Sequence, residues 1–294
     1  MRYLLVLLPL CWLVGAQNDV VDVMNKLGLR TTVQLLGVAN LIPVLQARES
    51  CTVFAPTDEA FSNLPTDLKE QLLSSKMFLI EVLLFHVSPN TTMSTDWKNN
   101  QLVMTLLETI SIRINKYPST VAMTADGGVI SSPDNKASNG VVHVIDQVLY
   151  PLPFDTIANE VGMVGQLYEL SKVIEKAGFG KILSDDGPLT FFAPTDDAFQ
   201  KLPNATLQNL LKNVTALEDV LSYHVVGGGV YYKAGLSNGE ELTTLQTGTL
   251  ECHVNRTSGS EPQVKINNAK IVGLVVPALN GAVHMIDTVL FPPK

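Results

Sequence analysis

The sequence predicts an α+β fold made of two copies of one domain. The stretch Thr52 to Phe61 (TVFAPTDEAF) returns as Thr190 to Phe199 (TFFAPTDDAF) with eight of ten residues unchanged, at an offset of 138 residues. A second stretch, Asn139 to Pro151, returns as Asn280 to Pro292 at an offset of 141 residues. This period is the size of a whole domain and excludes short solenoid repeats. Within each copy helical spacing precedes strand alternation, which is typical of an α+β domain with a sandwich or wedge core.

The first sixteen residues predict a secretory signal peptide. Arg2 precedes an apolar run from Tyr3 to Val14, and cleavage is expected after Ala16. The expected divisions are a signal peptide at 1–16, a first domain at 17–152 and a second at 153–294. We expect no transmembrane segment, because no other stretch is apolar over the length that a bilayer requires. The mature protein is therefore expected to be exported and soluble.

The composition argues against nucleic acid as a partner. The chain has 20 Lys and Arg against 28 Asp and Glu, a formal net charge of −8. Phosphate binding needs clustered basic residues, and the basic residues here form no run. We expect an acidic, solvated surface. A basic partner or a calcium-rich matrix stays open as the alternative.

The first copy is expected to begin with helices and one short strand. Residues 19–50 have the apolar spacing of two or three short helices. An apolar strand follows and ends at Pro56, which has no N–H to donate to a sheet. Thr57 suits the N-cap of the next helix, and the acids Asp58 and Glu59 then lie in its first turn, facing the positive end of the helix dipole.

The rest of the first copy changes from helices to strands. Residues 67–87 predict two helices, of which the second, from Met77 to Val87, is apolar nearly all round and belongs in the core. From Thr91 the spacing approaches a period of two. Strands are expected at Val103, 111–114, 120–123 and 128–130, with a hairpin turn at Asp126-Gly127. Asn139-Gly140 predicts a turn before a last strand that is apolar on both faces and so buried on two sides.

The second copy repeats this plan. Helices are expected at 154–182, 196–202 and 206–225, an opening strand at 189–193, and further strands between 229 and 291. Thr195 and Asp196 take the places of Thr57 and Asp58. The segment Pro151-Leu-Pro153 between the copies is too short and stiff for a flexible linker, so the domains are expected to touch.

The repeated motifs resemble those of the fasciclin-domain family. Its first box is similar to 52–61 and 190–199, its second box to 139–151 and 280–292, and its tyrosine-histidine motif to Phe85-His86 and Tyr223-His224. Phe85 departs from the tyrosine that is usual there. The resemblance covers residues 17–294 and implies that each copy is a wedge of about seven strands with helices packed on it.

The resemblance also implies a role in adhesion. Adhesive fasciclin proteins engage integrins, and the candidates for partner binding are Phe85, His86, Tyr223 and His224. The family's other adhesion peptide pairs aspartate with isoleucine before the closing box. The places matched to it read Pro133-Asp134-Asn135 and Pro277-Ala278-Leu279, and neither keeps the pair. No Arg-Gly-Asp occurs in the sequence. The alternative is that the tyrosine-histidine segments belong to the core.

One set of polar residues recurs in both copies and could carry chemistry. Its members are Thr57, Asp58, His86, His143 and Asp146, matched by Thr195, Asp196, His224, His284 and Asp287. A hydroxyl, an imidazole and a carboxylate are the parts of nucleophilic catalysis. Each residue also has a structural explanation, as a helix cap, a helix end or a strand residue, and the sequence has no glycine-flanked serine elbow. We therefore expect no enzymatic activity, with an exported hydrolase as a remaining alternative.

We predict instead that Asp58 with His143, and Asp196 with His284, form or support a buried polar link between the two boxes. A zinc site would need three or four ligands in each copy. Each copy offers two matched histidines and no thiolate near them. No metal and no cofactor is expected.

Four sequons become plausible glycosylation sites if the chain is exported. They are Asn90, Asn204, Asn213 and Asn255.

Cys51 and Cys252 remain after the predicted cleavage, and they do not occupy matched positions. A disulfide repeated in each copy is therefore ruled out. Three alternatives stay open: two free thiols, a bridge between the domains, and a bridge between molecules.

The sequence thus predicts a secreted, N-glycosylated, tandem-domain protein that acts by binding in the extracellular matrix or in cell adhesion. Its expected partners are matrix or cell-surface proteins, with integrins among them. The alternative function is an extracellular carrier or receptor for a small apolar ligand or a polysaccharide, held in a groove.

Overall fold

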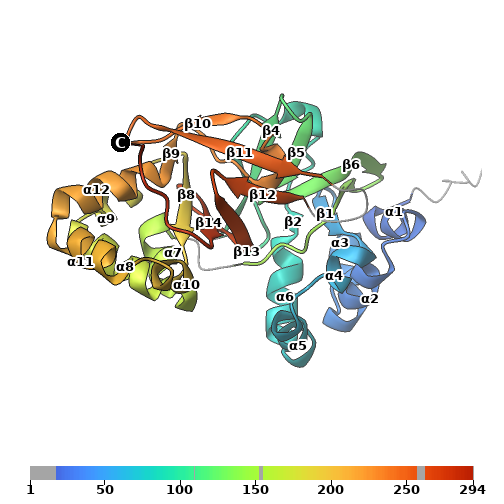
Figure 1. Cartoon of the computed structure of the whole chain (residues 1–294). Helices are drawn as coiled ribbons and strands as arrows, with labels where there is room; N and C mark the ends of the chain where they lie inside the picture. The colour runs from blue at the N-terminus through green and yellow to red at the C-terminus, as the bar shows by residue number, and fades with distance from the viewer. Residues whose placement is uncertain (1–17, 109, 152–154, 257–261, 294) are drawn as a thin grey trace, which may run out of the picture.

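The computed structural model describes residues 18–108, 110–151, 155–256 and 262–293. The predicted signal peptide at 1–16 lies outside these residues. Each copy forms one seven-stranded sheet with helices packed on it, the α+β architecture that the sequence predicts. The helices of the two copies lie at opposite sides of the molecule, and the strands lie between them (Figure 1).

The first copy begins with helices and ends with strands. Its helices are α1 (Val20–Lys26), α2 (Arg30–Ala39), α3 (Ile42–Gln46), α4 (Asp58–Ser62), α5 (Thr66–Ser74), α6 (Lys76–Phe85) and the short 3₁₀ helix η1 (Ser94–Asp96). Its strands are β1 (Thr52–Pro56), β2 (Val87–Ser88), β3 (Gln101–Met104), β4 (Ser111–Tyr117), β5 (Ala122–Ala125), β6 (Gly128–Ala137) and β7 (Gly140–Ile145).

The second copy follows the same order. Its helices are α7 (Ile157–Met163), η2 (Gly165–Leu167), α8 (Tyr168–Ala177), α9 (Gly180–Leu183), α10 (Asp196–Gln200), α11 (Asn204–Lys212), α12 (Val214–Tyr223) and η3 (Lys233–Gly235). Its strands are β8 (Leu189–Pro194), β9 (Val225–Gly227), β10 (Glu241–Thr243), β11 (Thr249–Asn255), β12 (Gln263–Ile266), β13 (Ala269–Ala278) and β14 (Gly281–Ile286).

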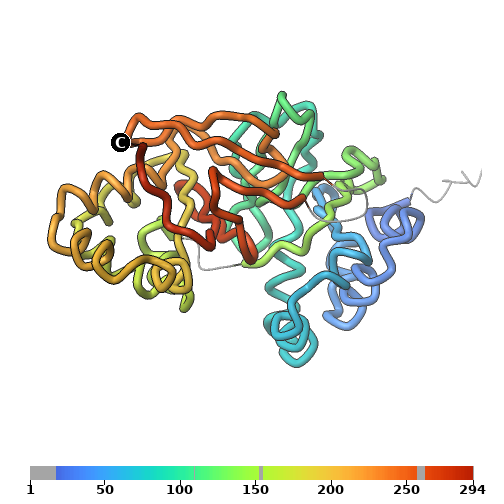
Figure 2. The backbone as a smooth tube through the Cα atoms, viewed as in Figure 1, coloured from blue at the N-terminus to red at the C-terminus, as the bar shows by residue number. Residues whose placement is uncertain are grey.

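The two sheets have the same topology. The strand order is β2-β1-β7-β6-β5-β4-β3 in the first copy and β9-β8-β14-β13-β12-β11-β10 in the second. The chain completes one sheet before it begins the other, so in the described residues neither sheet takes a strand from the other copy (Figure 2). The two repeated boxes form a parallel pair inside each sheet, with Phe54 opposite His143 and Phe192 opposite His284.

The parallel pair at the centre of each sheet is buried on both faces. Val53 and Ala55 of β1 belong to the apolar cluster beneath the helices, whereas Phe54 packs on the other face with Trp97 and Ile145. Parallel strand pairs are typically covered on both sides, because their faces are apolar throughout. In β7 every residue from 141 to 145 is buried, which confirms the prediction of a strand buried on two sides.

Local signals fix several of these elements. Asp126 and Gly127 both have positive φ, at 43° and 91°, and they form the predicted hairpin turn between β5 and β6. Three details differ from the predictions. The helix expected to reach Val87 ends at Phe85, and Val87 begins β2. The strand expected at 120–123 begins only at Ala122, because Val121 adopts φ 55° in the preceding turn. The helical stretch expected at 206–225 is two helices separated at Asn213, whose backbone is extended and whose side chain accepts from the N–H of Ala216 to cap the second.

Candidate functional site

The two matched histidines of the tyrosine-histidine motifs join a helix to the segment that follows the last strand. His86 is buried at the end of α6, where its Nδ1 lies 2.7 Å from the carbonyl of Val82. The backbone N–H of Leu149 donates to its Nε2 at 2.9 Å. The ring must therefore be neutral, with its proton on Nδ1. His224 makes the same contacts in the second copy, where Leu290 is the donor at 3.0 Å. Burial lowers the pKa of each ring to about 4.

A repeated asparagine makes a second long-range link. The Oδ1 atom of Asn139 accepts from the N–H of Val20, and its Nδ2 donates to the carbonyl of Leu45, both at 2.9 Å. Asn280 accepts from the N–H of Ile157 in the same way. The sequence predicts only a turn at these asparagines. Their recurrence in both copies is the signal that could have indicated a buried role.

Thr57 makes the contact expected of an N-cap. Its hydroxyl oxygen accepts from the N–H of Ala60 at 3.1 Å, and Thr195 accepts from the N–H of Ala198 at 3.3 Å. A hydroxyl that accepts a backbone N–H at a helix start satisfies a donor that the helix leaves open. This contact gives Thr57 and Thr195 a structural role as helix caps.

The predicted link between Asp58 and His143 is wrong as a direct contact. Asp58 accepts from the N–H of Thr31 at 2.8 Å, near the start of α2, which has no side-chain cap of its own. Asp196 accepts from the N–H of Glu169 in α8 at the same distance. A carboxylate at a helix N-terminus is favoured by the helix dipole and by the open N–H groups. The carboxylate of the first box thus holds a neighbouring helix, whereas the two boxes are joined by the backbone pairing of β1 with β7 and of β8 with β14.

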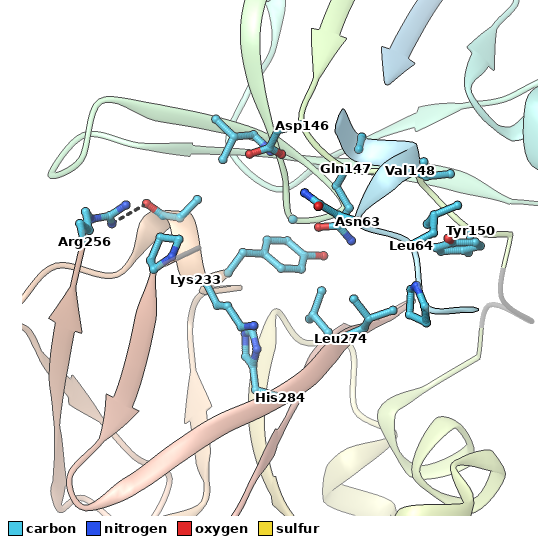
Figure 3. A pocket seen from close by; sticks show the side chains of 18 residues that line it. Asn63, Leu64, Asp146, Gln147, Val148, Tyr150, Lys233, Arg256, Leu274 and His284 are labelled. Atoms are coloured by element: carbon cyan, nitrogen blue, oxygen red, sulfur yellow. Dashed lines mark hydrogen bonds between the residues drawn. The ribbon is translucent and has the colours of Figure 1, made fainter. Parts of the chain in front are cut away.

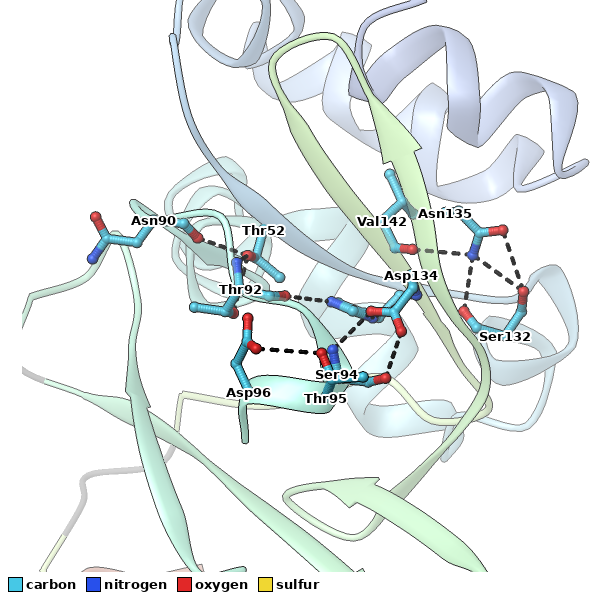
Figure 4. Close-up of polar contacts among 11 residues, drawn as sticks. Thr52, Asn90, Thr92, Ser94, Thr95, Asp96, Ser132, Asp134, Asn135 and Val142 are labelled. Atoms are coloured by element: carbon cyan, nitrogen blue, oxygen red, sulfur yellow. Dashed lines mark hydrogen bonds and ion pairs between the residues drawn. The ribbon is translucent and has the colours of Figure 1, made fainter. Parts of the chain in front are cut away.

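His143 packs beside Phe54, on the face of the sheet away from the helices, and bonds to a polar cluster that includes Thr92, Ser94 and Asp134. Figure 4 shows these three residues. The Nδ1 atom of His143 accepts from the backbone N–H of Asp134 and its Nε2 donates to the carbonyl of Thr92, each at 3.0 Å. The hydroxyl of Ser94 donates to the Asp134 carboxylate. A catalytic triad needs the serine to be bonded to the histidine that takes its proton. Here the serine is bonded to the acid and the imidazole acceptor is occupied by a backbone N–H, so this arrangement does not suit nucleophilic catalysis.

The second copy lacks this cluster. Asn135 pairs with Val142 and Val276 pairs with Val283, so the residue in the place of Asp134 is Val275. The matching of 133–135 with 277–279 made from the sequence is therefore wrong by three residues.

Because Val275 stands where the first copy has Asp134, His284 has one hydrogen bond within the described residues. The Nε2 atom of His284 donates to the carbonyl of Tyr231 at 2.8 Å, and its Nδ1 has no partner among the described residues. The two copies therefore differ in the contacts of His143 and His284.

The candidates for partner binding are buried. Phe85, His86, Tyr223 and His224 are between 0 and 3% exposed. The Tyr223 hydroxyl donates to the carbonyl of Thr249 at 2.9 Å. In this conformation a partner reaches none of these four side chains. A role of the tyrosine-histidine segments in partner binding stays a prediction.

The sequons and the cysteines differ in exposure. Asn90, Asn204, Asn213 and Asn255 are exposed, as glycan attachment requires, and their glycosylation stays a prediction.

Cys51 and Cys252 are free and buried, which favours two free thiols over a bridge between the domains or between molecules. Burial raises the pKa of their thiols, to about 11 and about 12. Such thiols stay protonated and unreactive.

The two copies dock through the end of β4. The hydroxyl of Tyr117 donates to the carbonyl of Val230 at 2.9 Å and accepts from the N–H of Tyr232 at 3.1 Å. Its ring lies so close to Gly235 that a Cβ there would come within 2.4 Å of it. Arg113 of the same strand donates to the carbonyl of Leu279 at 2.5 Å. Tyr117 and Arg113 are 7% and 5% exposed, so these bonds form away from water, where they are strongest.

The described residues contain no cluster of metal ligands and no membrane-spanning helix. Their His, Cys, Asp and Glu side chains include no group of three or more that could hold a metal ion. None of their helices is both long and apolar enough to cross a membrane.

Comparisons with known proteins agree with the repeat. A family model described as "Fasciclin domain" matches residues 27–151 and 165–292. Transforming growth factor-beta-induced protein ig-h3 of Sus scrofa is 29% identical over 270 residues, which is 89% of this chain and 38% of that protein. Periostin of Homo sapiens is 28% identical over 276 residues, which is 94% of this chain and 32% of that protein. The chain thus spans less than two fifths of either relative.

A solved structure of the FAS1 domain pair from the insect cell adhesion molecule fasciclin I is 18% identical over 91% of this chain and 98% of that chain, with a TM-score of 0.45. The family assignment is based on the sequence matches.

Proposed function

The chain belongs to the fasciclin-domain family, and from this premise we propose that it is a secreted protein that acts by binding other proteins, in the extracellular matrix or in cell adhesion. We also propose that residues 17–152 and 153–294 are its two domains. Matrix or cell-surface proteins are the partners that this role requires, with integrins as one class. The signal peptide on which secretion depends lies outside the described residues.

One observation supports a binding role over catalysis. Three of the polar residues that the two copies share hold the fold: Thr57 caps a helix, Asp58 holds a second helix, and His86 fixes the segment after the last strand. Their counterparts in the second copy make the same contacts. Residues that make the same structural contacts in both copies stabilise the fold. The function is then carried by residues on the surface of the domains.

Cell attachment tests this proposal. Surfaces coated with the intact chain should retain more cells than surfaces coated with albumin or with the same chain after denaturation. If integrins are the receptors, chelation of divalent ions should abolish attachment, and added Mg²⁺ should restore it. Attachment that survives chelation would exclude integrins. Attachment no greater than that on albumin, across several cell types, would contradict the adhesive function.

A further inference from the structure

A cavity lies between the two copies, and both of them line it (Figure 3). Its volume is about 330 Å³, near the lower end of the range for small-molecule sites. The first copy contributes the segments that follow α4 and β7. The second copy contributes residues of η3, β13 and β14. Interfaces between domains are common places for ligand sites, and this volume suits one small molecule rather than a polysaccharide chain.

Three polar groups in the cavity wall have no hydrogen-bond partner among the described residues. They are the hydroxyls of Tyr150 and Tyr232 and the Nδ1 atom of His284. Tyr232 is 1% exposed and His284 is fully buried. Because Nε2 of His284 donates to the carbonyl of Tyr231, Nδ1 can only accept in the neutral ring. Buried polar groups are normally paired, so three unpaired ones in the wall of a single cavity leave hydrogen-bonding capacity for a molecule bound there.

Charge is distributed unevenly around the cavity. Lys233 and Arg256 come from the second copy, and Lys233 lies on the same wall as His284 (Figure 3). Asp146 lines the opposite wall, where its carboxylate accepts from the N–H of Val129 at 2.7 Å. A ligand with one acid group would therefore turn that group toward the second copy, where charge-assisted hydrogen bonds are available.

The remaining wall is largely apolar. Leu64 and Val148 of the first copy face Leu274 and Val275 of the second. These side chains provide contact for a hydrocarbon or aromatic body but offer no polar group to a sugar.

We infer that the cavity between the two copies binds a small organic acid with an apolar body. The acid group lies at Lys233 and Arg256 of the second copy, where Arg256 also donates through Nη2 to the carbonyls of Ala234 and Leu236. The hydroxyl of Tyr150, from the first copy, contacts the ligand at the opposite end of the cavity (Figure 3). Nδ1 of His284 accepts a hydrogen bond from a hydroxyl or amine of the ligand. This site goes beyond the binding of proteins, and it narrows the carrier alternative of the sequence to one class of ligand.

Two dyes of nearly equal shape test the inference. The probe 1-anilinonaphthalene-8-sulfonate has an aromatic body, an amine and a single anionic group, and N-phenyl-1-naphthylamine is its uncharged counterpart. Fluorescence titration of the intact chain should show one saturable site for the sulfonate, with a Kd about tenfold or more below that of the amine. The inference is overturned if no saturable site is found, or if the uncharged dye binds as tightly as the sulfonate.

Three substitutions locate the site. Lys233→Met should weaken sulfonate binding about tenfold. Lys265→Met, which removes an exposed cation on β12 of the same copy, should leave the affinity unchanged. Tyr150→Phe should weaken binding without lowering Tm, because the hydroxyl that it removes has no partner in the described part of the chain.

Two results would place the dye elsewhere and contradict the inference. One is equal affinity of the wild type and both lysine variants. The other is a Tyr150→Phe variant with lower Tm and unchanged affinity, because the hydroxyl would then serve the fold through an ordered water.

Discussion

Lowering the pH from 6.5 to 4 should cost the folded chain on the order of 5 kcal/mol of its free energy of unfolding. The cause is three buried histidines, His86, His224 and His284, whose pKa burial lowers from 6.5 to about 4. Between these two values the unfolded chain binds protons that the folded chain excludes. Their contribution to stability is therefore complete above pH 6.5 and is lost as the pH falls toward 4.

Two carboxyl groups act in the opposite direction. Burial raises the pKa of Asp126 to about 7, from a usual value of 3.8, and it also raises the pKa of Glu160. A raised pKa gives stability that is complete at low pH and is lost as the pH rises through the folded value, so Asp126 offsets about one of the three histidines. His143, whose pKa burial also lowers, adds to the loss. The net effect stays a loss in acid.

Urea unfolding at a series of pH values measures this effect. The variant His224→Gln should be less stable at pH 7, but it should lose only about half as much stability between pH 6.5 and 4 because one excluded proton is gone. His253→Gln, on the surface, is the control and should behave as the wild type does. A free energy of unfolding that is constant over this range would contradict the neutral, buried state of the histidines.

Gly281→Ala should destabilise the chain by about 4 kcal/mol or more. Gly281 begins β14, and a Cβ there would lie 1.9 Å from the carbonyl oxygen of Leu189 in the neighbouring parallel strand. Backbone atoms cannot move aside as a flexible side chain can, so the parallel pair would have to separate. Gly140 has the same constraint in the first copy, where the distance to the carbonyl oxygen of Cys51 would be 2.0 Å.

The matched control is Gly162→Ala. Gly162 lies inside α7, on the exposed side, and a Cβ there would meet no atom within 4 Å. The same substitution should therefore stabilise the chain, by up to about 1 kcal/mol, because alanine favours a helix over glycine. Thermal unfolding of the two variants gives the comparison. A Gly281→Ala chain as stable as the wild type would contradict the strand spacing described here.

Features set by neighbouring residues were predictable from the sequence. Thr57 caps α4 through a residue three positions away, and Asp126-Gly127 turns the chain between two adjacent strands. The two faces of β7 follow from its alternation and its apolar content. The repeat itself then indicates that whatever is found in one copy should be sought in the other.

Contacts between distant residues were not predictable. The sequence predicts only a turn at Asn139. Its hydrogen-bond partner Val20 is 119 positions away, and no motif near either residue indicates that they pair. The predicted partner of Asp58 is wrong because its carboxylate accepts from a backbone N–H at the start of α2, a donor that no feature of the sequence distinguishes from the His143 ring. The cavity depends on Tyr117 reaching the second copy, and no periodicity encodes how two domains dock.

The cavity between the two copies exists only if the copies keep one fixed arrangement. Tyr117 and Arg113 hold that arrangement through their hydrogen bonds to the second copy. Residual dipolar couplings of backbone amides, measured on the intact chain, report this arrangement directly. The couplings from both copies should fit a single alignment tensor, with the relative orientation shown in Figure 1. Two tensors of different magnitude or direction would show that the copies move independently, and would contradict the docked pair.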